Sequence, residues 1–317
     1  MKSQPAGLGP WAVALAAALW ATDAVFRVPA LGKLSPLAIV WAEHAIAFTV
    51  LSLILTARGR WRQFSGLTLG TWAGAALVGA GGSALATVLF TASFRFVSPS
   101  VSILLQKLQP VLVILLARTF LGERPVRHFW GWAFLALAAS LAVSFPGFRF
   151  GTSWNELTDF GSSGVLLAIS AASLWALSTV VGKRVIPALS SDAATFLRFG
   201  FGLLALSFGL LLHLGDSTFS AGPEWPSSQD WQSLAPALLY MALVPGLLSI
   251  VLYYSGLRRT PAAVATLLEL TFPVSAIAVN ALFLGERLQT SQLLAAAVLL
   301  AAVSKISLSG IRSEPSH

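Results

Sequence analysis

Long apolar runs separated by short polar connections dominate this chain. At a rise of 1.5 Å per residue, about 20 apolar residues are needed to cross a hydrocarbon layer roughly 30 Å thick. The pattern predicts ten membrane-spanning helices, at residues 10–31, 36–57, 68–92, 97–117, 128–146, 163–182, 192–213, 233–256, 261–283 and 289–308. Two connections are longer, 147–162 and 214–232, and their Gly, Ser, Pro and acidic residues predict polar loops.

The composition indicates that lipid is the solvent for most of the protein. The chain has 317 residues, of which 56% are hydrophobic and only 10% are charged. Soluble domains carry roughly 25% charged residues. So much apolar surface does not fit inside one or two soluble cores, and we therefore predict an all-α integral membrane protein.

The net charge of +8 does not indicate a nucleic-acid partner. The basic residues are scattered between apolar runs and form no continuous patch, whereas binding to nucleic acid needs one. The chain has no cysteine, which excludes disulfides and thiolate metal sites. The spacing of histidines and acids within the predicted helices does not match a metal site, so we expect neither a metal nor another cofactor.

A repeated pentapeptide indicates internal duplication. Residues Phe120–Arg124 recur as Phe283–Arg287, and each copy ends an apolar segment that contains a proline, Pro110 or Pro273. When the spacing between the two copies is kept, the alignment of the two segments extends toward the N-terminus as far as Phe90. Duplicated halves in an apolar chain are typical of secondary transporters.

The repeat predicts two inverted halves. Residues 1–146 and 163–308 would each form five helices around a central cavity, joined by the outer loop 147–162 and followed by a tail at 309–317. Because five is odd, the second half enters the membrane upside down relative to the first. Lys and Arg are more frequent in the connections on the side of the two termini, which predicts that both termini lie in the cytoplasm. The protein is thus expected to be a multi-pass protein of the cell (inner) membrane.

Several short motifs occur in the same order in both halves. In the second half they are Trp175-Ala176, Lys183, Phe196-Leu197-Arg198-Phe199, Thr260-Pro261-Ala262-Ala263 and Gly285-Glu286; in the first half they are Trp20-Ala21, Pro36, Ser98-Pro99 and Gly122-Glu123. With these motifs the chain resembles the EamA family of the drug/metabolite transporter superfamily. The resemblance implies a ten-helix exporter or importer of amino acids, metabolites or similar small solutes. The first half departs from the pattern at Ala42-Glu43-His44, which stands where the second half has Leu197-Arg198-Phe199.

Ionisable residues inside the predicted helices are candidates for function, because each costs roughly 2.5–3.5 kcal/mol in hydrocarbon. These residues are Asp23, Glu43, Lys107, Arg198 and Glu269. Their positions along the helices place the first three in the outer half of the membrane. The last two lie closer to the inner face.

We hypothesise that Lys107, together with Gln106 and Gln109, binds a carboxylate or other polar group of a solute. Asp23 and Glu43 would bind its ammonium group or take up a coupling proton. The alternative is that these charges form permanent ion pairs that only neutralise one another. For Arg198 and Glu269, opposite charges at similar depth, mutual neutralisation is the favoured interpretation.

Two aromatic residues and two prolines complete the candidate site. Trp20 and Trp175 occupy similar positions in the first and sixth predicted helices, where they would stack on a solute or pack beside the cavity. Pro110 and Pro273 would act as hinges next to the binding region or produce simple kinks. The glycines of the predicted helix at 68–92 favour close contact between helices.

Together these features predict a secondary transporter. It would move a small polar or amphipathic, amino-acid-like solute by alternating access, with export as the favoured direction. A membrane-embedded enzyme acting on a lipid would need clustered nucleophiles, metal-binding acids or a phosphate-binding loop, and the sequence shows no such motif. A non-transporting sensor or scaffold is the other alternative. The pattern leaves the oligomeric state open.

Overall fold

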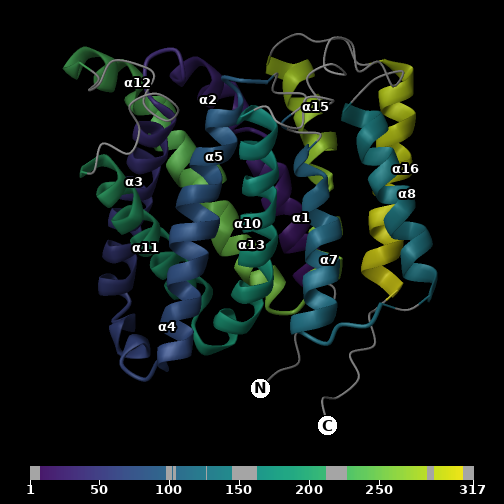
Figure 1. The fold of residues 1–317 in the computed structure, drawn as a ribbon, viewed down its shortest axis with the longest axis horizontal. Coiled ribbons are helices and arrows are strands. Elements are labelled where there is room, and N and C mark those ends of the chain that lie inside the picture. Colours follow the sequence, from purple (N-terminus) through teal and green to yellow (C-terminus); the bar gives the residue numbers. More distant parts are fainter. Residues whose placement is uncertain are drawn as a thin grey trace.

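The computed structural model describes residues 8–97, 102, 105–125, 127–144, 163–211, 227–283 and 289–309. Within these residues all regular structure is helical, and the helices run roughly along one direction (Figure 1). The predicted loop at 147–162, the tail from 310 and Gly285-Glu286 lie outside the described residues. The fold is that of an all-helical integral membrane protein.

The helices of the first half are α1 (Leu8–Trp20), α2 (Ala24–Ala30), α3 (Pro36–Ala57), η1 (Arg60–Phe64), α4 (Leu69–Ala76), η2 (Leu77–Leu85), α5 (Ala86–Ser93), α7 (Leu108–Phe120) and α8 (Arg127–Ser144). Those of the second half are α10 (Ser163–Val185), η4 (Ile186–Ala188), α11 (Ser191–Leu211), α12 (Ser228–Met241), η5 (Ala242–Leu248), α13 (Ser249–Leu257), α14 (Ala262–Leu268), α15 (Thr271–Phe283) and α16 (Thr290–Ser309).

Seven of the helical stretches in the described residues are long and apolar enough to cross a membrane. They are Leu8–Ala30, Pro36–Ala57, Leu69–Ser93, Ser163–Ala188, Ser191–Leu211, Ser228–Leu257 and Ala262–Phe283. Each matches a predicted helix. The helices α7, α8 and α16 lie where the other three were predicted, but α7 and the apolar part of α16 are shorter. The number of ten therefore stays a prediction.

One predicted boundary was wrong. The polar loop was predicted to extend to residue 232, but α12 begins at Ser228. The side chain of Ser227 accepts a hydrogen bond from the backbone of Asp230, whose carboxylate accepts one from the backbone of Ser227. This reciprocal capping satisfies two backbone donors, so a polar sequence starts a helix here.

Within the described residues, three of the helical stretches are interrupted by short turns. The chain turns at residues 21–23 between α1 and α2, at Lys107 before α7, and at 269–270 between α14 and α15. Pro110 and Pro273 are each the third residue of the helix that follows the turn. A proline has no N–H and its ring clashes with the carbonyl four residues earlier, here that of Gln106 or Glu269. The interruptions consequently lie one turn before the prolines.

Two other helices contain π-helical stretches at corresponding places. One is η2, between α4 and α5, and the other is η5, between α12 and α13. Pro245 lies inside η5 and cannot donate a helical hydrogen bond. Such widened turns are frequent at functional sites. In this protein both stretches contribute residues to the cavity described below.

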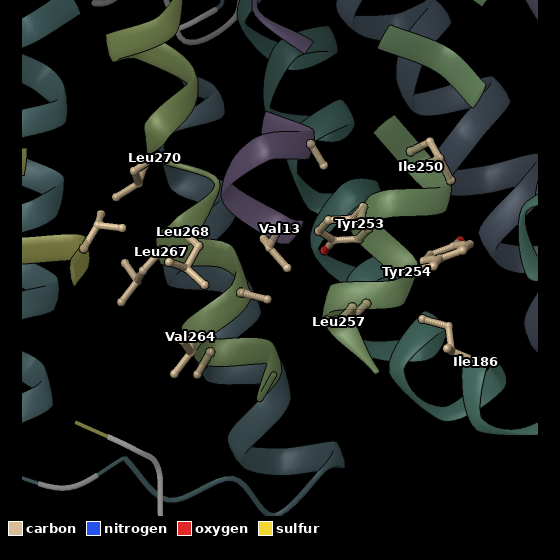
Figure 2. Close-up of a cluster of buried hydrophobic side chains, with 14 of the residues drawn as sticks. Val13, Ile186, Ile250, Tyr253, Tyr254, Leu257, Val264, Leu267, Leu268 and Leu270 are labelled. Carbon is tan, nitrogen blue, oxygen red and sulfur yellow. The ribbon is translucent and has the colours of Figure 1, made fainter. Parts of the chain in front are cut away.

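The largest hydrophobic cluster joins the two halves. Val13 of α1 lies between Tyr253 and Leu257 of α13 and Leu268 of α14 (Figure 2). Helix α1 packs along α13, whereas α10 packs along α5 and α7. The pair α8 and α16 also lie side by side (Figure 1). The first helix of each half is thus surrounded mainly by helices of the other half.

Glycines of η2 allow two helices to approach it closely, as the sequence predicted. A Cβ atom at Gly79 would lie 2.6 Å from the backbone oxygen of Arg198 and 2.6 Å from Cβ of Phe201. A Cβ atom at Gly82 would overlap Ser178. At Gly81 the nearest atom would be 3.8 Å away, on Leu174. The first two glycines therefore permit the contacts with α11 and α10, while Gly81 makes no such contact.

This difference predicts opposite effects of two alanine substitutions. Gly79→Ala should lower the free energy of unfolding by about 1–3 kcal/mol, because α11 must move away from η2. Gly81→Ala, the matched control, should be neutral or stabilising, since alanine favours helix over glycine by about 1 kcal/mol. Thermal unfolding of both variants in detergent measures this. Equal melting temperatures would contradict the proposed close contact.

Candidate functional site

A central cavity of about 290 Å³ lies between the two halves. Ligand pockets typically measure roughly 300–1,000 Å³, so the cavity suits a small solute. All nine residues that the sequence predicted to bind a solute line it: Trp20, Asp23, Glu43, Gln106, Lys107, Gln109, Trp175, Arg198 and Glu269. Of the predicted hinges, Pro110 lines the cavity and Pro273 does not. The structure thus brings these residues together, and their role in binding remains a prediction.

Two of the acids are bridged by an arginine. Arg27 binds both carboxylate oxygens of Asp23, with Nη2 at 2.9 Å from Oδ1, and the same Nη2 donates to Glu43 Oε1 at 2.7 Å. Only 8% of the surface of Arg27 is exposed. Its guanidinium offsets one of the two negative charges of Asp23 and Glu43. The i, i+4 spacing of Asp23 and Arg27 on one helical face was a signal that the sequence analysis missed.

Lys107 lies in the turn before α7 and faces the cavity. Its ammonium nitrogen is 5.8 Å from the centre of the Phe272 ring, which is a cation–π contact. Among the residues that the structure describes, no carboxylate lies in ion-pair contact with it. The ion pair considered for Lys107 is therefore not formed, and the ammonium can meet an acceptor on a solute.

Arg198 on α11 is held by neutral acceptors. It donates to Ser83 Oγ at 3.1 Å, to the Tyr254 hydroxyl at 3.3 Å and to the Gly82 carbonyl at 3.4 Å. The predicted pairing of Arg198 with Glu269 was wrong for this structure, since the ion pairs of the described residues do not include one between them. The π-helical η2 supplies two of these acceptors. The sequence analysis estimated only how deep each residue lies in the membrane, and depth does not show which neighbouring helix a side chain contacts.

Glu269 lies in the turn between α14 and α15 and also has neutral partners. Its carboxylate accepts a hydrogen bond from the Tyr253 hydroxyl at 2.8 Å and another from Gln109 Nε2 at 3.0 Å. The Tyr253 hydroxyl is in turn 3.2 Å from Thr179 Oγ1. This chain of polar groups crosses from α7 through α13 to α10.

Aromatic rings form much of the apolar wall. Trp20 packs on Tyr253 with ring centres 5.4 Å apart, and Trp175 packs on Phe90 at 5.1 Å. Both tryptophans thus pack against a neighbour and face the cavity at once. Flat conjugated groups stack favourably on such rings. The alternatives of stacking on a solute and packing beside the cavity are both compatible with this arrangement.

Other lining residues escaped the sequence analysis. They include Arg27, His44, Ser83, Phe90, Thr179, Tyr253, Tyr254 and Phe272. His44 and Glu43 both line the cavity, although consecutive residues of a helix point about 100° apart. The His44 ring is held by hydrogen bonds with the Val40 carbonyl at 2.8 Å and Ser83 Oγ at 3.0 Å, as expected of a packing histidine. Phe90 and Tyr253 correspond in the repeat alignment, a signal that could have pointed to them.

The arrangement suits recognition of a solute. It combines stacking surfaces, a cation, and neutral hydrogen-bonding groups in a cavity between two halves, as in transporters. The described residues contain no group of three histidines or acids that could hold a metal ion.

Comparisons with known proteins support transport. The EamA-like transporter family model matches residues 7–145 and again residues 162–308. The riboflavin transporter ImpX of Fusobacterium nucleatum subsp. nucleatum is 30% identical, and the alignment covers 94% of this chain and 97% of ImpX. YetK of Bacillus subtilis, named as an uncharacterized transporter, is 28% identical over 56% of this chain and 50% of its own length.

The fold has a counterpart among solved structures. One crystal structure superposes with a TM-score of 0.73 over 97% of this chain and 99% of the other, at 19% sequence identity. At that identity the likeness shows the fold alone. The two family matches together cover most of the sequence, and the chain therefore belongs to the EamA-like transporter family.

Proposed function

We propose that this protein is a secondary transporter that moves a small amphipathic metabolite with a flat conjugated ring across the cytoplasmic membrane by alternating access. Riboflavin is the first candidate solute, because the relative ImpX is named for its transport. Export, the direction favoured by the sequence analysis, is kept in the proposal. Both termini would lie in the cytoplasm.

The observation that carries this proposal is the composition of the cavity. Trp20 and Trp175 offer flat apolar surfaces from opposite halves. Lys107 and Gln106, together with Gln109, offer donors to a solute's carbonyl oxygens and ring nitrogens. Riboflavin has both kinds of group. An amino-acid-like solute, predicted from the sequence, would use the polar groups but leave most of the aromatic wall without a partner.

Equivalent contacts in the two halves support the inverted repeat. The Trp20–Tyr253 contact corresponds to the Trp175–Phe90 contact under the alignment of the halves. In the same way Gly9 lies against Arg259 and Thr260, and Gly164 lies against Phe96 and Val97. Each contact joins one half to the other. Such reciprocal pairs are expected when two related bundles are packed about a two-fold axis.

Contacts at one end of the bundle support alternating access. Glu123, which is 8% exposed, accepts hydrogen bonds from the backbone N–H groups of Ala262 at 2.7 Å and Ala263 at 2.9 Å. Lys183 donates to the carbonyl of Thr260 at 2.6 Å. The start of α1 and the end of α16 lie at this same end (Figure 1). These bonds would hold the end closed, and alternating access requires them to break.

Transport by purified protein in liposomes tests the proposal. Wild-type protein should move riboflavin across the membrane, which its fluorescence reports. Lys107→Gln should lower the transport efficiency by about ten- to a hundredfold, since hydrogen bonds to charged groups contribute roughly 1.5–3 kcal/mol. Lys305→Gln on the exposed side of α16 is the matched control and should transport normally. Transport of labelled amino acids but not riboflavin would overturn the proposed solute class, and transport of neither would overturn the function.

Cysteine labelling tests the inverted arrangement. The chain has no cysteine, so single cysteines can be introduced at equivalent positions of the pentapeptide, Arg124→Cys and Arg287→Cys. A membrane-impermeant maleimide added to intact cells should label the second variant. The first should react only after the cells are permeabilised. Labelling of both variants from one side would rule out two inverted halves.

A further inference from the structure

Glu269 differs from the other acids of the cavity in lacking a cationic partner. Its carboxylate is partly buried and is held by Tyr253 and Gln109, which are neutral hydrogen-bond donors. Within the described part of the chain no lysine, arginine or histidine is in ion-pair contact with it. A carboxylate shielded from water and without a cation is costly in free energy, and a bound proton removes that cost.

Asp23 and Glu43 are in the opposite situation. Arg27 contacts both of them, and its single positive charge offsets one of their two negative charges. Protonation of either acid would break a charged contact and leave the buried arginine with one partner fewer. The sequence analysis chose Asp23 and Glu43 as acceptors of a coupling proton, but the geometry makes them poorer candidates than Glu269.

We propose that Glu269 is the residue that takes up and releases a proton coupled to movement of the solute. This inference rests on the transport function proposed above. A hydronium ion on one side of the membrane transfers its proton to a Glu269 oxygen, giving a neutral carboxylic acid and water. After the halves have moved, water on the other side accepts the proton and the carboxylate is restored.

The partners of Glu269 can form hydrogen bonds with its carboxyl group in both the ionised and the protonated state. When ionised, it accepts from Tyr253 and Gln109 as observed. When protonated, its O–H needs an acceptor, and rotation of the Gln109 amide presents its oxygen in place of the nitrogen. The Tyr253 hydroxyl still donates to the other carboxyl oxygen, and Thr179 lies within hydrogen-bond distance of that hydroxyl. In both states Glu269 thus keeps a hydrogen bond with Tyr253 and with Gln109.

The position of Glu269 links its protonation to movement of the halves. Gln109 belongs to α7 in the first half, directly before Pro110, whereas Tyr253 belongs to α13 in the second. Hydrogen bonds to a charged group are roughly twice as strong as those between neutral groups. Protonation would therefore weaken the contact between the halves beside two interrupted helices.

Other charged or titratable groups face the same cavity and contribute to the field at Glu269. They are Tyr253 and Tyr254 from α13, Lys107 from the turn before α7, Arg198 from α11, Glu43 and His44 from α3, and Asp23 and Arg27 at the junction of α1 and α2. Lys107 and Arg198 lack a carboxylate partner among the described residues. They favour the ionised form of Glu269 and so promote release of the proton from its protonated form.

Riboflavin transport in liposomes with and without an imposed pH gradient tests the inference. For each protein the gradient-driven flux is divided by the exchange flux at equal pH on both sides. This ratio should rise with the gradient in the wild type and fall to about one in Glu269→Gln. Glu43→Gln should keep a ratio above one. An unchanged ratio in Glu269→Gln, or a wild-type ratio of one, would overturn the inference while leaving the transport function in place.

A second measurement needs no solute. Infrared difference spectra of the membrane-embedded protein at low and high pH report the C=O band of protonated carboxylic acids. A band present in the wild type should be missing in Glu269→Gln and retained in Glu43→Gln and in Asp230→Asn, an acid at the start of α12 that does not line the cavity. A band that survives in Glu269→Gln would refute the assignment, whether or not riboflavin proves to be the solute.

Discussion

Hydrocarbon offers no hydrogen-bond partner to the peptide backbone, and this constraint determines where helices in a membrane can be interrupted. In this protein the three turns within long apolar helices all border the central cavity. They bring Asp23, Lys107 and Glu269 to its surface. Polar backbone and polar side chains are thus exposed to the same internal space and not to lipid.

The prolines show how sequence produces two of these interruptions. Pro110 and Pro273 each follow the turn by one helical turn or less, because a proline disturbs the carbonyl four residues before it. The residues at the interruption, three or four positions before the proline, therefore reach the cavity. In one half this gives Gln106 and Lys107, and in the other half Glu269. The two turns thus carry opposite charges, Lys107 in one and Glu269 in the other.

The buried charges are satisfied in three different ways. Arg27 joins Asp23 and Glu43 in an ionic cluster, Arg198 and Glu269 use neutral hydrogen-bond partners, and Lys107 lies over an aromatic ring. Only the first arrangement sets opposite charges against one another within the protein. The other two leave charges that a solute or a proton can meet, and this difference separates structural from functional candidates in the cavity.

Much of this could be predicted from the sequence, because apolar length and internal repetition are local properties of a chain. They gave the all-helical membrane fold, the family, the seven long helices and five of the ionisable residues that line the cavity. Contacts between distant residues could not be obtained in that way. The bridge from Arg27 to Glu43, the separation of Arg198 from Glu269, and the aromatic pairs with Phe90 and Tyr253 depend on how helices are rotated and packed. Hydropathy sets the depth of a residue in the membrane, whereas only the tertiary structure decides which neighbour its side chain meets.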